Sequence, residues 1–211
     1  VQHHHAHMAS CMADNSLEGP CIGVVWDGTG YGTDGTIWGG EFLVGDYRSF
    51  ERLGSLRPIA LAGGDRAVKE ISRVGYALLL DAGCPERSAV PEGKRNLLEK
   101  MIAGGLNSPR ASSMGRLFDG VYAILTGREH VTYEGQGAIL LETMAERCEG
   151  AYPVTLEASG DRLDWDFRPM VRELVQELDA GVNPARLAAK FMNTVVEMAC
   201  AQCTQIRERT G

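Results

Sequence analysis

The order of apolar and polar positions along the chain predicts strands first and helices after them. Cys21 to Trp26 is a short continuous apolar run, typical of a buried strand, and Asp27 is expected to end it. Returning strands are predicted over 36–44 and 49–56, with Asp34-Gly35 as the turn of the first hairpin. The glycine-rich segment between the first two strands is therefore predicted to be a hairpin tip.

Most of the remaining chain shows apolar residues at spacings of three and four, which predicts helices. Asp65 is expected to cap a helix that ends at Gly83, and Ser112 or Ser113 is expected to cap another. Asn183 is expected to cap a long last helix that begins at Pro184. A short strand pair is predicted on either side of Ser159-Gly-Asp161. The predicted helices cover 65–82, 96–102, 113–125, 132–148, 168–178 and 184–209, besides one over the N-terminal histidines. The pattern indicates a mixed α/β (α+β) fold whose core is one piece.

Composition narrows the possible partners. A net charge of -7 over 211 residues argues against nucleic acid, since phosphate binding needs a basic face. No apolar run reaches the roughly 18 residues of a membrane span, and no signal peptide is visible, so we expect no membrane partner and a cytoplasmic location. The six cysteines are scattered, and we expect reduced thiols.

Four of the five histidines gather at positions 3, 4, 5 and 7. Three in a row followed by His7-Met-Ala-Ser10 would also fit the remnant of an affinity tag, although Ala6 interrupts the run. His3 and His7 stand at i and i+4, roughly 6 Å apart on one helix face, where two imidazoles can share a metal ion. His4 and His5 point elsewhere. We therefore predict His3 and His7 as ligands.

The run Asp27-Gly-Thr-Gly-Tyr-Gly-Thr-Asp-Gly35 is the second candidate for chemistry. Its glycines allow backbone amides to approach an anion closely, and Asp27 is placed to be a third metal ligand. The run is neither a Walker A motif nor a Rossmann fingerprint, and a glycine-rich hairpin is often only a turn. Two histidines with a carboxylate suit Fe(II) and Zn(II) equally, so the divalent metal stays undefined.

Two further segments are candidates for nucleotide contact. Gly63-Gly64-Asp65 places flexible residues at a helix N-terminus, which favours anions, although a simple capped turn fits as well. Arg116 and Asp119 stand at i and i+3 on one helix face. They are either a surface ion pair of little energy or an arginine for phosphate and an aspartate for ribose.

Five segments occur in a characteristic order: Val1-Gln-His-His-His-Ala-His-Met-Ala-Ser10, Asp27-Gly-Thr-Gly-Tyr-Gly-Thr-Asp-Gly-Thr-Ile-Trp-Gly-Gly-Glu-Phe42, Gly63-Gly-Asp65, Ser112-Ser-Met-Gly-Arg-Leu-Phe-Asp119 and Tyr133-Glu-Gly-Gln136. Together they closely resemble the HypF-type carbamoyltransferases of NiFe-hydrogenase maturation, over the whole chain, which makes the histidines native. The chain departs from the usual motifs at Ala62, at Ile71-Ser72 and at Met192, where family members carry proline, proline-tryptophan and histidine.

The resemblance is to the domain similar to the universal tRNA threonylcarbamoyl-transferases, which implies a partial actin-like/Hsp70-like (ASKHA) nucleotide-binding fold. Residues 1–211 would form most of one carbamoyltransferase domain. Acylphosphatase-like, zinc-finger and carbamoyl-adenylate-forming domains would precede Val1, and a last segment with a further metal-binding aspartate would follow Gly211.

The resemblance also implies an activity. Carbamoyl adenylate, made from carbamoyl phosphate and ATP, would pass its carbamoyl group to the C-terminal cysteine of the partner HypE. His3, His7 and Asp27 would bind the metal, and Asp119 the ribose. The remaining contacts to the adenylate would come from Gly28, Thr29, Gly30, Gly64, Asp65 and Arg116. No catalytic residue is assigned. Two alternatives stay open: a small-molecule O-carbamoyltransferase, and a catalytically silent nucleotide-binding or docking module.

Overall fold

The computed structural model describes all of residues 1–211, which form eight α-helices, one short 3-10 helix and seven strands. The strands are β1 (Cys21–Tyr31), β2 (Ile37–Gly45), β3 (Phe50–Leu56), β4 (Ile59–Ala60), β5 (Arg110–Ala111), β6 (Thr155–Ser159) and β7 (Arg162–Asp166). The helices are α1 (His3–Asp14), α2 (Asp65–Lys69), α3 (Ser72–Ala82), η1 (Pro85–Arg87), α4 (Glu92–Gly104), α5 (Met114–Thr126), α6 (Gln136–Met144), α7 (Arg168–Asp179) and α8 (Pro184–Thr210). None of these helices combines the length and the apolar character that a membrane span requires.

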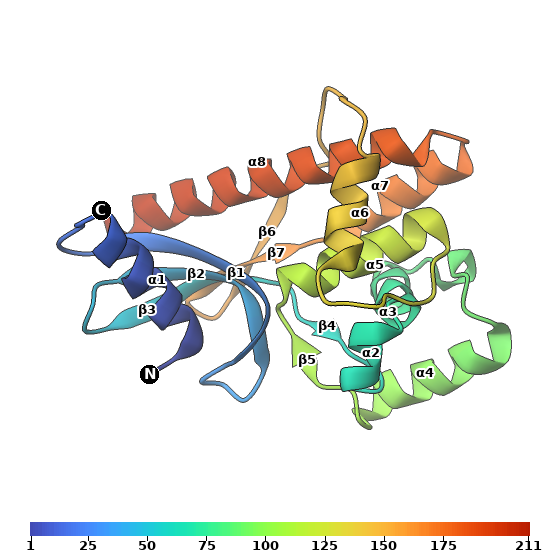
Figure 1. Ribbon diagram of the computed structural model, residues 1–211, viewed down its shortest axis with the longest axis horizontal. Helices are drawn as coiled ribbons and strands as arrows, with labels where there is room; N and C mark the ends of the chain where they lie inside the picture. The colour runs from blue at the N-terminus through green and yellow to red at the C-terminus, as the bar shows by residue number, and fades with distance from the viewer.

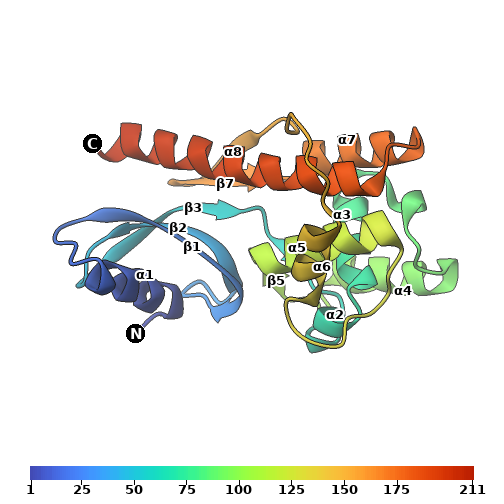
Figure 2. The ribbon, with the colours of Figure 1, turned by 45° about the horizontal axis from the view of Figure 1, so that its top comes forward.

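All seven strands belong to one mixed sheet. Its order is β4-β5-β2-β3-β7-β6, and β1 pairs with β2 outside this path. The first three strands form the predicted antiparallel meander, while β2 pairs in parallel with β5 and β3 with β7. The long hairpins and α1 gather at one end, α2 to α6 at the other, and α8 runs along both (Figures 1 and 2).

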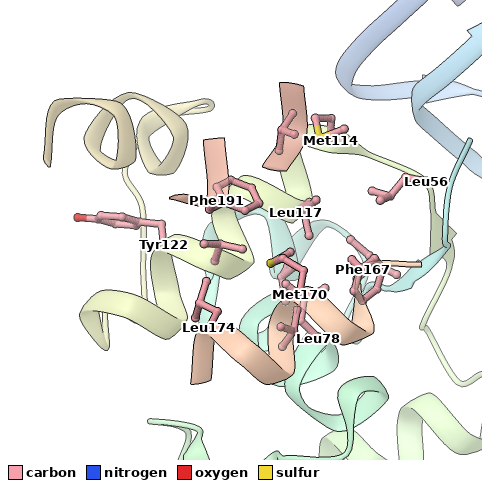
Figure 3. Packing of buried hydrophobic residues seen from close by; sticks show 14 of the residues in the cluster. Leu56, Leu78, Met114, Leu117, Tyr122, Phe167, Met170, Leu174 and Phe191 are labelled. Carbon is pink, nitrogen blue, oxygen red and sulfur yellow. The ribbon is translucent and has the colours of Figure 1, made fainter. Parts of the chain in front are cut away.

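The main core lies where α3, α5, α7 and α8 pack together and against the sheet. Figure 3 shows Leu78, Leu117, Met170 and Phe191, one from each of these helices, converging on one another. The prediction of a single core was wrong, because two smaller clusters are separate from the main one. In one of them Met8 and Met12 of α1 pack on Trp38 and Leu43 of β2 and Val25 of β1. This small cluster holds the histidine helix on the sheet.

The predicted helix over 65–82 is broken into α2 and α3. Glu70 ends α2 with a non-helical backbone, and its carboxylate accepts hydrogen bonds from Arg66, from Arg73 at 2.6 Å and from Lys94 at 3.0 Å. Burial acts to raise the pKa of Glu70, but these hydrogen bonds outweigh burial and lower it to about 2. The break therefore centres on a buried carboxylate that is satisfied by three cations.

Two other helix boundaries also differ from the prediction. Helix α4 is longer, ending at a left-handed Gly105, and α6 is shorter, beginning only after a left-handed Gly135. The predicted caps at Ser113 and Asn183 are confirmed, since each side chain accepts a hydrogen bond from a backbone amide in the first turn of its helix. The Asp65 cap is not formed: Gly64 occupies the cap position and no side chain caps α2.

Candidate functional site

Asp27 lies within β1 rather than at its end. The strand continues to Tyr31, but its register with β2 shifts between Trp26 and Gly30, so Asp27 stands in an irregular stretch of the ladder. Such irregularities redirect side chains. Ser113, the cap of α5, ties this stretch down by donating a hydrogen bond to the carbonyl of Gly28 at 2.7 Å.

The structure brings His3, His7 and Asp27 together. Their ligand atoms all lie within 4.8 Å of one another. The Nε2 atom of His3 is 2.7 Å from Oδ2 of Asp27 and 3.2 Å from Nε2 of His7. Two imidazole nitrogens and one carboxylate oxygen converging on one point form a donor set that fits Zn(II) or Fe(II) and leaves coordination positions for a substrate.

Glycine is required where the hairpin meets α1. A Cβ on Gly30 would lie 2.4 Å from Cε1 of His4 and 2.8 Å from Cδ2 of His3. Gly30 therefore lets the histidine helix approach β1, and it does not line the pocket described below. The other two histidines of the run point away from the cluster: His4 is buried beside Trp38, and Nε2 of His5 lies 2.8 Å from the carbonyl of Asp46.

The carboxylate of Asp27 is kept ionised by its neighbours. Partial burial acts to raise its pKa, but hydrogen bonds from the His3 ring and from the backbone amides of Gly28 and Thr29 hold the pKa below its usual value. These amides, which we expected to face an anion, are instead 2.5 and 3.4 Å from Oδ1 of Asp27. Their role in this structure is to orient a candidate metal ligand.

A pocket of about 290 Å³ begins next to Asp27. Five of the predicted nucleotide-contacting residues line it, namely Gly28, Thr29, Gly64, Asp65 and Arg116. They come from β1, from the start of α2 and from α5, so the fold brings residues of three separately predicted segments to one cavity. The loop into α2 needs its glycines, because both Gly63 and Gly64 have positive φ, at 102° and 57°.

Arg116 and Asp119 are not a surface ion pair, because each side chain is only 3 % exposed, with Nη1 of Arg116 3.0 Å from Oδ2 of Asp119. Burial raises the pKa of Asp119 to about 6, Arg116 opposes this shift, and Glu134 adds to it. Asp119 stands behind Arg116 and is not among the residues that line the pocket, so its contact with a ribose stays a prediction. The Nε atom of Arg116 is buried and has no hydrogen-bond partner within the protein.

Two charged lining residues had been given no role by the sequence reasoning, namely Lys69 and Glu134. Lys69 is the last residue of α2, next to the break in the predicted long helix. Glu134 lies in the turn before α6, within the Tyr133-Glu-Gly-Gln136 motif. That motif was the available signal for Glu134.

Residues 23–211 match a protein family described as "Carbamoyltransferase, Kae1-like Domain, second subdomain". The chain belongs to the HypF carbamoyltransferase family. It is 36 % identical over 221 residues to carbamoyltransferase HypF of Synechocystis, and 42 % identical over 188 residues to that of Rhizobium leguminosarum. These matches cover 94 % and 84 % of this chain but only 29 % and 23 % of the relatives. The chain thus spans less than a third of these HypF proteins.

Solved structures of HypF agree with this assignment. A full-length HypF crystallised with phosphate and nucleotide superposes with a TM-score of 0.93 at 38 % identity, over 100 % of this chain and 28 % of that one. HypF of T. kodakarensis superposes with a TM-score of 0.83 at 28 % identity, over 99 % of this chain and 29 % of that one. The predicted fold class, a partial ASKHA-type nucleotide-binding fold, is confirmed for this HypF segment.

Proposed function

We propose that this chain is the part of a carbamoyltransferase that holds carbamoyl adenylate beside a divalent metal and passes the carbamoyl group to the C-terminal cysteine of HypE. The observation that carries the proposal is the junction of Asp27 and Gly28. Through these consecutive residues, a three-ligand cluster and a pocket containing a buried arginine share one irregular stretch of β1. The full-length HypF relative that was crystallised with phosphate and nucleotide supports a nucleotide in this family.

His3, His7 and Asp27 would hold the metal, Fe(II) or Zn(II). A metal bound there would polarise a phosphoryl or carbonyl oxygen and stabilise negative charge near it. The guanidinium of Arg116, which lines the pocket, would bind the phosphate of the adenylate together with Lys69, which also lines it. Buried cations act strongly on a phosphate because little water screens them.

The proposed transfer needs no nucleophile from this chain. The cysteine thiolate of HypE attacks the carbamoyl carbon, the new S–C bond forms, and the bond from that carbon to the phosphate oxygen breaks. AMP leaves with the electron pair, and the thiol proton goes to solvent. Arg116 would stabilise the charge that grows on the departing phosphate, and the walls of the pocket would fix the adenylate relative to the metal.

Elemental analysis and mass spectrometry together test this proposal. We expect about one bound Zn(II) or Fe(II) per chain, lost in His7→Ala and retained in His130→Ala, which removes an exposed histidine far from the cluster in sequence. Residues 1–211 alone are expected to be inactive. When the chain is extended by the last segment that the resemblance implies and is given preformed carbamoyl adenylate, metal and HypE, the HypE mass should rise by one carbamoyl group, and His7→Ala should abolish the increase.

Three results would contradict the proposal. Equal metal loss in His7→Ala and His130→Ala would remove the assigned ligand set. Binding of metal and adenylate followed by carbamoylation of a small-molecule hydroxyl, with HypE unmodified, would replace HypE as the acceptor. Binding without any transfer would favour a nucleotide-binding module.

A further inference from the structure

Arg116 shares its position at the pocket with a second acidic residue besides Asp119. Oε1 of Glu134 lies 3.8 Å from Nη2 of Arg116. The same oxygen would be 2.7 Å from a Cβ on Gly28, so the carboxylate rests against the backbone of the hairpin. Whereas Asp119 is buried, the side chain of Glu134 is 66 % exposed. Glu134 therefore stands on the solvent side of the arginine, where a ligand would enter.

The turn that carries Glu134 is well defined. Gly135 is left-handed with φ of 79°, and the backbone amide and hydroxyl of Thr132 both donate to Oε1 of Gln136, at 2.6 and 3.1 Å. These contacts fix the conformation of the turn before α6. A fixed turn keeps the negative charge of Glu134 close to any phosphate that binds Arg116.

The ligands of the proposed reaction differ in charge at this point. The phosphate of an acyl adenylate such as carbamoyl adenylate, a mixed anhydride, carries one negative charge. AMP is a phosphate monoester with a second pKa of ~6, and its phosphate carries ~1.5 to 2 negative charges at neutral pH. Repulsion from a neighbouring carboxylate is therefore stronger for AMP than for the acyl adenylate.

Resting on the proposed function, we propose that Glu134 is a specificity-determining residue: its carboxylate disfavours the dianionic phosphate of AMP and so favours adenylates with a monoanionic phosphate, such as carbamoyl adenylate, over the AMP that the transfer releases. Glu134 thereby assists product release, and Arg116 supplies the attraction that both ligands share. The geometry that carries this inference is the placement of one exposed carboxylate between a buried arginine and the glycine wall of the pocket.

Calorimetric titration of the 211-residue chain with AMP and with the methyl ester of AMP, at pH 8 and constant ionic strength, tests the inference. Glu134→Gln should increase the affinity for AMP about fivefold and the affinity for the monoanionic methyl ester about twofold. The dianion is repelled about twice as strongly as the monoanion, and water between the charges keeps both effects small. Adenosine should change little. Glu142→Gln, which removes the same charge from an exposed position on α6, the helix that follows Glu134, should leave all three affinities unchanged.

The competing results are distinct. Equal weakening of AMP and its methyl ester in Glu134→Gln would show that Glu134 contacts the ligand favourably, which overturns the inference and leaves the nucleotide site intact. Equal tightening of both ligands would overturn the charge discrimination. Failure of the unmodified chain to bind either ligand would contradict the proposed nucleotide site itself, and the role of Glu134 with it.

Discussion

Replacing Asp119 with asparagine should change how the stability of the protein depends on pH. Asp119 is 2 % exposed. Burial raises its pKa from the ordinary 3.8 to about 6, and the nearby Arg116 opposes this shift without cancelling it. Asparagine keeps nearly the same shape but cannot ionise, so the comparison isolates the titration.

The sign follows from the direction of the shift. An acid whose pKa is higher in the folded state keeps its proton there at pH values at which the unfolded chain has already lost it. Stability from this group is therefore complete below about pH 4, falls between about pH 4 and pH 6, and stays lower above that range. With the two pKa values 3.8 and about 6, the loss between about pH 4.5 and pH 8 is about 2 kcal/mol.

Urea unfolding of both proteins at several pH values measures this loss. Asp119→Asn also leaves the buried Arg116 without its counter-charge, but that effect does not depend on pH and cancels when the pH values are compared. Relative to the wild type, the variant should gain about 2 kcal/mol between pH 4.5 and pH 8, with equal m-values. A constant difference, or one that changes in the opposite direction, would mean that Arg116 keeps Asp119 fully ionised and would refute the reasoning.

Three further substitutions test the packing around the site. Gly30→Ala should lower metal affinity at least tenfold, because the new Cβ collides with His4. The control Gly93→Ala, whose Cβ meets nothing within 4 Å, should leave metal affinity unchanged. Equal metal affinities of the two variants would contradict the role of the hairpin glycine. Ser113→Ala removes the α5 cap and should lower the free energy of unfolding by about 1 kcal/mol, measured by urea; no loss would show that the cap is dispensable. Phe191→Ala empties a fully buried position and should reduce that free energy by about 3 to 5 kcal/mol; a loss under about 1 kcal/mol would place Phe191 outside the core.

Much of the fold could be predicted because its signals are local. The apolar run before Asp27 predicts a strand, and Pro184 after Asn183 predicts the start of the last helix, as observed. The break at Glu70 was not predictable in this way. It is associated with Arg66 on the same helix, Arg73 on the next, and Lys94 on a helix that begins more than twenty residues later. Helical spacing contains no information on such a distant partner.

The candidate metal cluster shows the same division between local and distant information. The i, i+4 spacing of His3 and His7 is a property of one helix, and it correctly predicts that the two rings converge. Asp27 joins them from β1, which required the hairpin to lie against α1. The absence of a side chain at Gly30 and the packing of Met8 on the sheet allow that contact.

The burial of Arg116 was the decisive feature that spacing could not predict. The spacing of Arg116 and Asp119 places them on one face of a helix. Whether that face is exposed to solvent depends on the position of β1, which is hydrogen-bonded to Ser113 at the start of α5. An arginine in the wall of a pocket attracts an anion more strongly than the same residue on the surface, because less water screens its charge.

The hairpin wall connects the two halves of the site. On one side Gly30 admits α1 and its histidines, and on the other Gly28 admits Glu134 and Arg116, so neither position tolerates a larger side chain without moving a functional group. Asp27 immediately precedes Gly28, and its carboxylate is oriented by the backbone amide of that glycine. A short glycine-rich segment therefore positions a candidate metal ligand and shapes the adjacent pocket, and its glycines at positions 28 and 30 are used for close approach rather than for positive φ.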